Sequence, residues 1–188
     1  SPQPMKEEYL LTGKLEPTNE GYGISKIAGL KLCQYYNKQY KTNFISLMPC
    51  NLYGPNDHFD PKKSHVTPAL ILKFHNAKKE NLPFVEIWGT GNVKRELLFV
   101  EDLTDAILYF ILNYDAKDLD PFINIGYGKE VTIKELAFMI KDIVGYEGEI
   151  RFDPDKPEGM SEKLVDVTKS RKLGWKFKTD LKEGLKIW

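Results

Sequence analysis

The sequence predicts an α/β fold, because short apolar runs typical of strands alternate with longer segments of helical periodicity. Residues 20–41 place apolar side chains at three- and four-residue steps, which predicts a helix. Residues 44–48 form an apolar run closed by Pro49, which predicts a buried strand. A loop is predicted at 50–66. Ligands of such sheets bind beyond the carboxyl ends of strands, so we expect a site within residues 49–66.

The remainder of the chain continues this alternation. Pro68 suits the first turn of a helix that we expect to reach about Asn81. Thr132 and Glu135 form a capping box, which predicts a helix that ends at Gly145. Further strands are expected at 84–88, 95–100, 122–125 and 149–152, a further helix at 101–113, and a last helix capped by Thr179 or Asp180.

The composition excludes several classes of function. Lys+Arg and Asp+Glu both number 27 in the 188 residues, and this zero net charge argues against a nucleic-acid partner. No apolar run approaches the roughly 20 residues of a membrane-spanning helix, and no signal peptide is visible. Cys33 and Cys50 are too few for a disulfide framework or a zinc site. We therefore expect a cytoplasmic protein without a structural metal.

Both ends of the sequence are unusual for a complete chain. The first 20 residues read as a loop and lack a starting Met, while Trp188 falls within a helical pattern. These features predict a chain cut from a longer protein.

A possible catalytic pair lies in the first predicted helix. Tyr22 and Lys26 are four residues apart, so they share a face of the helix. An ammonium group beside a phenol favours the phenolate, and such a pair can pass a proton to or from an alcohol or ketone oxygen. Taken alone, the spacing fits an ordinary exposed helix face better, because a Tyr and a Lys four residues apart often occur by chance.

The surrounding motifs decide between these interpretations. Tyr22-x-x-x-Lys26, Asn51-Leu-Tyr-Gly-Pro55, Gly89-Thr-Gly-x-x-x-Arg95 and Val100-x-Asp-Leu103 together resemble the extended short-chain dehydrogenase/reductases. Ser64-His-Val-Thr-Pro-Ala-Leu70 and Lys73-Phe-His75 are similar to the corresponding motifs of the GDP-L-fucose synthases within that group. The similarity to these enzymes extends over nearly the whole chain. The resemblance implies NADP(H) as cofactor, a GDP-sugar as substrate and a homodimer. It implies 3,5-epimerisation of GDP-4-keto-6-deoxy-D-mannose, followed by reduction at C4.

The resemblance also assigns roles to residues. Tyr22 matches the proton donor of the reduction, and Lys26 matches its partner, which also anchors the ribose. His65 matches the acid of the epimerisation, a role that suits histidine because its side chain ordinarily titrates near neutral pH. The cofactor would contact Tyr22, Lys26, Pro49, Cys50, Asn51, Leu52 and His65, with Cys50 a small buried filler. The substrate would contact Lys73, Trp88, Arg95, Glu158 and Lys163. Glu162 stands where the resemblance leads us to expect a basic residue, which weakens the case for Lys163.

The domain division follows from the same resemblance. Residues 1–66 are expected to form the C-terminal part of a Rossmann cofactor domain, which lacks its N-terminal strands and its glycine-rich phosphate motif. Residues 67–188 are expected to form mainly a smaller α/β substrate domain, with some segments packing back on the Rossmann sheet. Two rivals remain: another sugar-nucleotide epimerase or dehydratase of the same group, and a non-catalytic nucleotide-binding fragment, which the absent glycine motif would suit.

Overall fold

The computed structural model describes residues 2–60, 64–119, 121–159 and 161–188. The helices are α1 (Glu20–Tyr40), α2 (Val66–Lys79), α3 (Val100–Asn113), α4 (Ile133–Val144), α5 (Thr168–Lys172) and α6 (Leu181–Ile187), with 3-10 turns at Glu7–Tyr9, Pro17–Asn19 and Ala116–Asp118. The strands are β1 (Leu47–Pro49), β2 (Asn51–Tyr53), β3 (Phe84–Trp88), β4 (Lys94–Phe99), β5 (Ile123–Ile125), β6 (Glu130–Thr132) and β7 (Glu149–Asp153). The predicted α/β class is confirmed.

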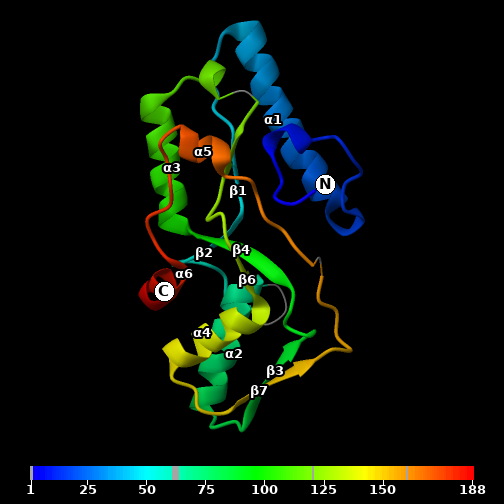
Figure 1. Ribbon diagram of the computed structural model, residues 1–188, viewed down its shortest axis with the longest axis vertical. Helices are drawn as coiled ribbons and strands as arrows, with labels where there is room; N and C mark the ends of the chain where they lie inside the picture. The colour runs from blue at the N-terminus through cyan, green and yellow to red at the C-terminus, as the bar shows by residue number, and fades with distance from the viewer. Residues whose placement is uncertain (1, 61–63, 120, 160) are drawn as a thin grey trace.

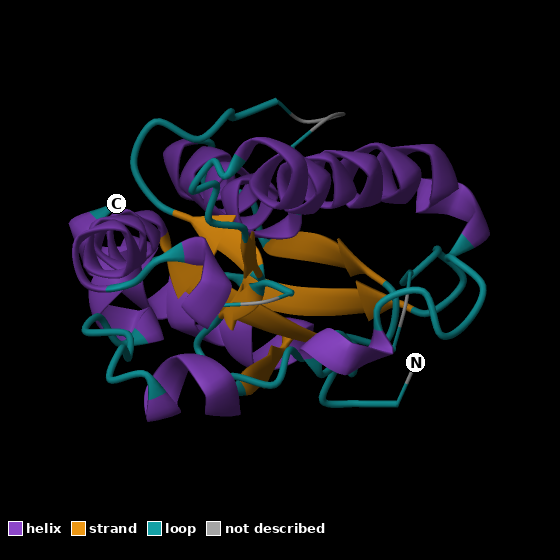
Figure 2. Ribbon diagram, turned by 90° about the horizontal axis from the view of Figure 1, so that it is seen from above, coloured by secondary structure: helices purple, strands orange, loops and turns teal. Residues whose placement is uncertain are grey.

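The strands form three small sheets along the length of the molecule (Figure 1). β1 pairs with β5 and β3 pairs with β7, both in parallel. Between them, β4 pairs in parallel with β2 and antiparallel with β6. Seen along the long axis, the strands lie between helices on either side (Figure 2). The parallel pairs are those expected where helical crossovers connect successive strands.

Two apolar clusters hold the elements together. One joins α2, α4 and β3 and has Phe74, Leu136 and Ile140 at its centre. The other joins β5, α3 and the C-terminal segment and contains Ile123, Phe110 and Trp175. Residues before and after position 66 contribute to both clusters, so the packing ties the two expected domains to each other.

Several predicted elements agree closely with the structure. The helix expected at 20–41 is α1, and the strand expected at 84–88 is β3. The capping box is present, since the Thr132 hydroxyl accepts the Glu135 amide and the Glu135 carboxylate accepts the Thr132 amide. α4 then ends at Gly145, whose φ of 67° is the left-handed conformation that glycine adopts without strain.

Other predictions were wrong in detail. The predicted loop at 50–66 begins with a strand, because Asn51–Tyr53 pairs with β4. Residues 61–63 of that loop lie outside the described residues. The first strand begins at Leu47, and Phe44 is 48% exposed. β6 and α5 were not predicted; each has at most five residues, which is too short for a periodicity to be visible. The Asp180 side chain accepts the Tyr127 hydroxyl at 2.6 Å instead of capping α6.

The buried Asp102 gives a test of this packing. Its carboxylate, on α3, accepts the backbone amides of Lys178 and Thr179 at 3.2 and 3.0 Å. Because Asp102→Ala leaves these amides unpaired, we expect the free energy of unfolding to fall by about 1–3 kcal/mol. Urea denaturation measures the change, with Asp142→Ala on the exposed face of α4 as control. Equal stability of the two variants would contradict this role.

Candidate functional site

A pocket of about 540 Å³ brings together three of the residues singled out from the sequence. Asn51 at the start of β2, Arg95 on β4 and Lys163 in the connection between β7 and α5 line it. In Figure 1 that connection runs up one side of the molecule from β7 to α5. The pocket therefore lies between the sheet of β2, β4 and β6 and the connection from β7 to α5. Two cations beside one amide are suited to hold an anionic ligand, against the opposing charge of Glu16, which also lines the pocket.

Arg95 is half-buried and held by backbone carbonyls. Its guanidinium donates to the carbonyl of Lys94 at 2.7 Å and to that of Glu158 at 3.5 Å. The Glu158 carboxylate accepts the Thr90 amide, and this hydrogen bond holds its pKa below the ordinary value. The carboxylate is thus committed to the Gly89–Gly91 turn, while the Glu158 carbonyl helps to orient Arg95. We infer that Glu158 shapes the site through its backbone and the turn.

Lys163 is exposed and lies beside a further charged cluster. The acidic Glu162 forms an ion pair with Lys94 at 2.6 Å, and this contact raises the pKa of Lys94. Glu162, which was not the residue expected before Lys163, therefore has its charge offset within the protein. That neutralisation leaves the positive charge of Lys163 available to the pocket.

The Tyr22 and Lys26 side chains share a face of α1, as predicted. The Lys26 ammonium lies 5.2 Å from the centre of the Tyr22 ring, and Tyr22 is 67% exposed. Three residues before Tyr22, Asn19 lines the pocket, so the start of α1 borders the same site. The contact between the two side chains is thus one of the ammonium with the face of the ring.

His65 occupies the residue just before α2. It is the N-cap, is exposed, and its side chain makes no capping hydrogen bond, while its carbonyl accepts the Ala69 amide at 3.1 Å. A structural capping role for the imidazole is thereby excluded. The ring stays available for acid–base work, although it does not line the pocket of Asn51.

The segment from Pro49 to Leu52 connects β1 to β2. The Asn51 amide donates to the Glu96 carbonyl at 3.1 Å, which fixes the side chain at the pocket wall. Burial raises the pKa of the Cys50 thiol strongly. A thiol with a raised pKa stays neutral, so Cys50 is not suited to act as a nucleophile.

Lys73 and Trp88 form a separate pair away from this pocket. The Lys73 ammonium lies 5.9 Å from the centre of the Trp88 ring and donates to the Glu86 carbonyl at 3.0 Å. Trp88 is 57% exposed, so it is not a core aromatic. An exposed indole beside a cation is suited to stack on a flat ligand such as a purine base.

The sequence analysis missed the opposite wall of the pocket. Glu16, Thr18 and Asn19 line it. The Glu16 carboxylate accepts the Thr18 hydroxyl at 2.5 Å and the Asn19 amide at 3.1 Å, and these bonds lower its pKa. A Glu two residues before a Thr, at the entrance of a helix, is the signal that could have marked this wall.

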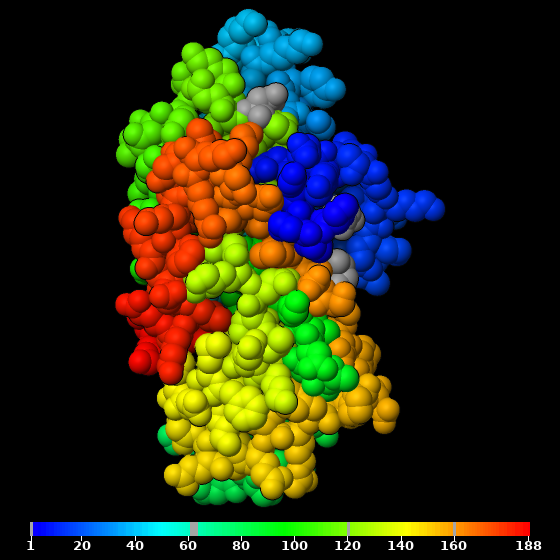
Figure 3. All heavy atoms as spheres, in the orientation of Figure 1, coloured from blue at the N-terminus to red at the C-terminus, as the bar shows by residue number. Residues whose placement is uncertain are grey.

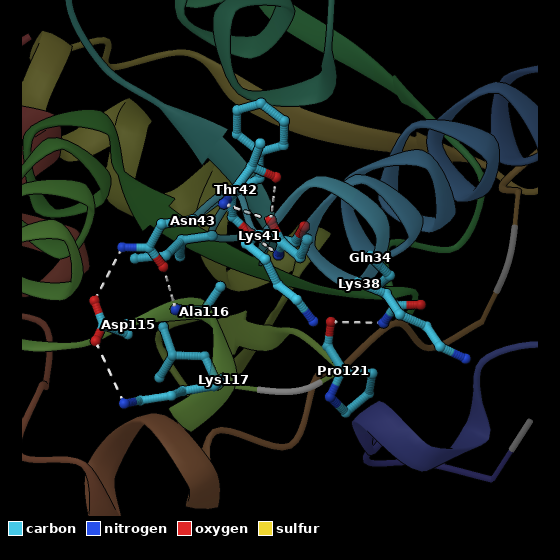
Figure 4. A pocket seen from close by; sticks show the side chains of 14 residues that line it. Gln34, Lys38, Lys41, Thr42, Asn43, Asp115, Ala116, Lys117 and Pro121 are labelled. Atoms are coloured by element: carbon cyan, nitrogen blue, oxygen red, sulfur yellow. Dashed lines mark hydrogen bonds and ion pairs between the residues drawn. The ribbon is translucent and has the colours of Figure 1, made fainter.

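A second hollow of about 620 Å³, at the C-terminal end of α1, has a different character (Figure 4). Its polar side chains bind one another and the backbone. The Gln34 amide donates to the Pro121 carbonyl, and Asn43 bridges Asp115 and the Ala116 amide. With these groups paired, we interpret the hollow as a structural junction between α1 and the segment before β5.

Neither a metal centre nor a membrane span is found in the described part of the chain. No three His, Cys, Asp or Glu side chains among the described residues gather as ligands. No described helix is long and apolar enough to cross a bilayer.

The comparisons with known proteins agree with the fold. A model of the NAD dependent epimerase/dehydratase family matches residues 1–126. A probable GDP-L-fucose synthase of Oryza sativa is 50% identical over 185 residues, which are 98% of this chain and 56% of that protein. The GDP-L-fucose synthase of Escherichia coli is 48% identical, with 97% and 59% covered. The chain thus spans somewhat more than half the length of these curated relatives.

Solved structures give the same picture. A GDP-mannoheptose C4 reductase of Campylobacter jejuni, with NADP bound, is 41% identical with a TM-score of 0.88 over 100% of this chain and 64% of that one. A GDP-L-fucose synthetase of Naegleria fowleri is 27% identical with a TM-score of 0.92, over 100% and 59%.

Proposed function

Because this chain belongs to the NAD dependent epimerase/dehydratase family, we propose that its protein makes GDP-L-fucose from GDP-4-keto-6-deoxy-D-mannose. The single observation that carries the proposal is the 50% identity, over 98% of the chain, to a relative named for this activity. The pocket of Asn51, Arg95 and Lys163 supports it, because a GDP-sugar carries a diphosphate that two cations can hold.

The proposed chemistry has two stages. A C4 ketone acidifies the hydrogens at C3 and C5. A base would remove the proton from one face of the sugar, and His65 would donate a proton to the opposite face of the resulting enolate, so that each centre inverts. NADPH, when bound, supplies a hydride to C4. Tyr22 would then donate its hydroxyl proton to the C4 oxygen, with Lys26 favouring the phenolate that remains. Hydride and proton together convert the ketone to an alcohol.

We propose which residues hold the nicotinamide end of NADP(H). Tyr22 and Lys26 on α1, His65 before α2, and the segment from Pro49 to Leu52 would hold that end. Arg95 and Lys163 would bind the diphosphate of the substrate. From this division of roles we also propose a cofactor domain up to residue 66 and a substrate domain after it. We propose a cytoplasmic location for the protein.

A reaction without epimerisation is the second candidate. The C4 reductase of Campylobacter jejuni, at 41% identity, acts on a GDP-heptose, so a ketone reduction on another GDP-sugar is compatible with this chain. The same Tyr22 chemistry would serve both candidates, and His65 would then be unnecessary.

Substrate conversion by the full-length protein tests the proposal. We expect NADPH oxidation with GDP-4-keto-6-deoxy-D-mannose and a product whose NMR spectrum is that of GDP-L-fucose. Reduction of the keto sugar without inversion at C3 and C5 would favour the second candidate. An absence of NADPH oxidation with any 4-keto GDP-sugar would overturn both.

We also propose a homodimer built on α1. Within this helix, all of whose residues are described, only Leu30 is buried, although Ile24, Leu32 and Tyr35 are each more than half exposed. An apolar helix surface of this extent is typical of a protein–protein interface.

Charge substitution tests the dimer. Leu32→Glu combined with Tyr35→Glu should convert the full-length protein to a monomer, because the two side chains lie one turn apart on α1 and would bury charges in the interface. Light scattering at micromolar concentration measures the mass, and Ile187→Glu on α6, 59% exposed, is the control. An unchanged dimer in the double variant, or a monomeric wild type, would contradict this surface.

A further inference from the structure

Glu96 is a carboxylate sealed inside the protein beside the candidate site. It lies on β4, directly after Arg95, and is 0% exposed. A buried carboxylate is costly unless hydrogen bonds replace its water, so its partners identify what it is for. No role in catalysis or binding has been given to it above, and it does not line the pocket.

The partners of Glu96 come from two segments far apart in sequence. One oxygen accepts the amide of Gly128, after β5, at 2.6 Å. The other oxygen accepts the amide of Val165, in the connection between β7 and α5, at 2.9 Å. Glu96 therefore fastens both segments to β4 through their backbones, whatever their side chains.

The residues around Glu96 leave room for its carboxylate and stabilise its charge. A Cβ atom at Gly126 would clash with the Glu96 oxygen, so the absence of a side chain there makes room for it. Burial raises the pKa of Glu96, and the amides of Val165 and Gly128 oppose that rise by stabilising the charge. The N-terminal residues reinforce the same place, because Met5 bridges in parallel to Val165. Figure 3 shows the N-terminal segment against the connection to α5.

This attachment is one of several that hold the segment of Lys163, since the Ser161 carbonyl accepts the Lys94 amide and the Leu164 carbonyl accepts the Met5 amide. The Val165 amide binds the Glu96 carboxylate, and Lys163 lies two residues before Val165. The backbone of Lys163 is therefore close to this hydrogen bond. Arg95 is the residue adjacent to Glu96 on β4. One buried side chain thus lies between the backbones that carry the two cations of the pocket. The charges of Glu96 and Lys163 both act on the Cys50 thiol, which places them in one neighbourhood.

We propose that Glu96 is a positioning residue, which ties the segment of Lys163 to the strand of Arg95 so that both cations face the diphosphate of the substrate. The proposal rests on the proposed function, since the diphosphate of a GDP-sugar is the ligand that the two cations would hold. Glu96 acts only through Lys163 and contacts no substrate itself. Its loss should therefore weaken binding of the nucleotide while the chemical step is retained.

The test is a double-mutant cycle in the full-length protein, with GDP binding measured by calorimetry and KM and kcat by NADPH oxidation. Glu96→Gln keeps the shape of the side chain but places an NH2 group against one of the two backbone amides, so one hydrogen bond is lost. The dissociation constant of GDP and KM should each rise about tenfold, while kcat should stay within threefold of the wild type. Lys163→Met should cost about as much. The double variant Glu96→Gln/Lys163→Met should then bind GDP no more weakly than Lys163→Met alone.

Two further variants keep the test decisive. Glu135→Gln changes another carboxylate that binds a backbone amide, in the capping box of α4, and should leave KM and kcat unchanged. If Glu96→Gln does not fold, Gly126→Ala displaces both members of the tie, the Glu96 carboxylate and the Val165 side chain, by steric contact and should show the same dependence on Lys163.

The outcomes separate this proposal from the proposed function. Additive losses in the double variant, or an unchanged GDP affinity in both Glu96→Gln and Gly126→Ala, would overturn the positioning role while leaving the activity standing. A wild-type protein that neither binds GDP nor reduces the keto sugar would overturn both. A fall in kcat at unchanged KM would also contradict the role, because it would locate the effect in the chemical step.

Discussion

Replacement of Tyr22 by Phe in the full-length protein should slow the C4 reduction by about 10²–10⁴-fold, because it removes one positioned proton donor. The variant keeps the ring over which the Lys26 ammonium lies, so the geometry of α1 should be retained. NADPH oxidation with the keto sugar measures the rate. KM should change much less than kcat, since the hydroxyl acts in the transition state.

A second tyrosine on the same helix provides the control. Tyr40 is 59% exposed and packs against Tyr36 with ring centres 5.1 Å apart and the rings tilted, away from the start of α1. Tyr40→Phe should leave the rate within twofold of the wild type. A Tyr22→Phe rate equally close to the wild type would remove Tyr22 from the mechanism.

Replacement of His65 by Asn should impair exchange of the C3 and C5 hydrogens with solvent, by a factor of the same order, about 10²–10⁴. The imidazole is exposed and makes no capping bond, so Asn at this N-cap should preserve α2. Tyr22→Phe should leave the same exchange largely intact, because the reduction follows the epimerisation. Deuterium incorporation followed by NMR measures both variants.

A histidine on the same helix separates the role from a general effect of the substitution. His75 is exposed on α2, and His75→Asn should exchange at the wild-type rate. If His65→Asn and Tyr22→Phe lost exchange to the same degree, the two chemistries would not reside in separate residues. Normal exchange in His65→Asn would instead favour the reductase without epimerisation.

The long helices are determined by patterns within a single segment of the chain. The 21 residues of α1 and the 12 of α4 have periodicities and end signals long enough to be recognised directly in the sequence. The pairing of Tyr22 with Lys26 was likewise predictable, because four residues of helix fix which side chains share a face. The motifs quoted from the sequence led to the family that the comparisons bear out.

Short strands are defined by their partners instead. Asn51–Tyr53 has no periodicity to distinguish it from a loop, and it becomes a strand only because Leu97–Phe99 on β4 lies beside it. Glu130–Thr132 is a strand for the same reason, through its antiparallel register with residues 94–96. Their hydrogen bonds join residues more than 30 positions apart, so no local window contains the cause.

The sequence by itself determined the long helices, the Tyr22–Lys26 pair and the family, since local backbone preferences and short motifs carry that information. The tertiary structure alone decided that Arg95 and Lys163 share a pocket while Lys73 and Trp88 lie apart as another pair. It also decided that the acidic residue Glu96 is fully buried. The physical reason is that burial and convergence depend on long-range contacts. The amides of Gly128 and Val165, 32 and 69 residues away, make the buried charge tolerable.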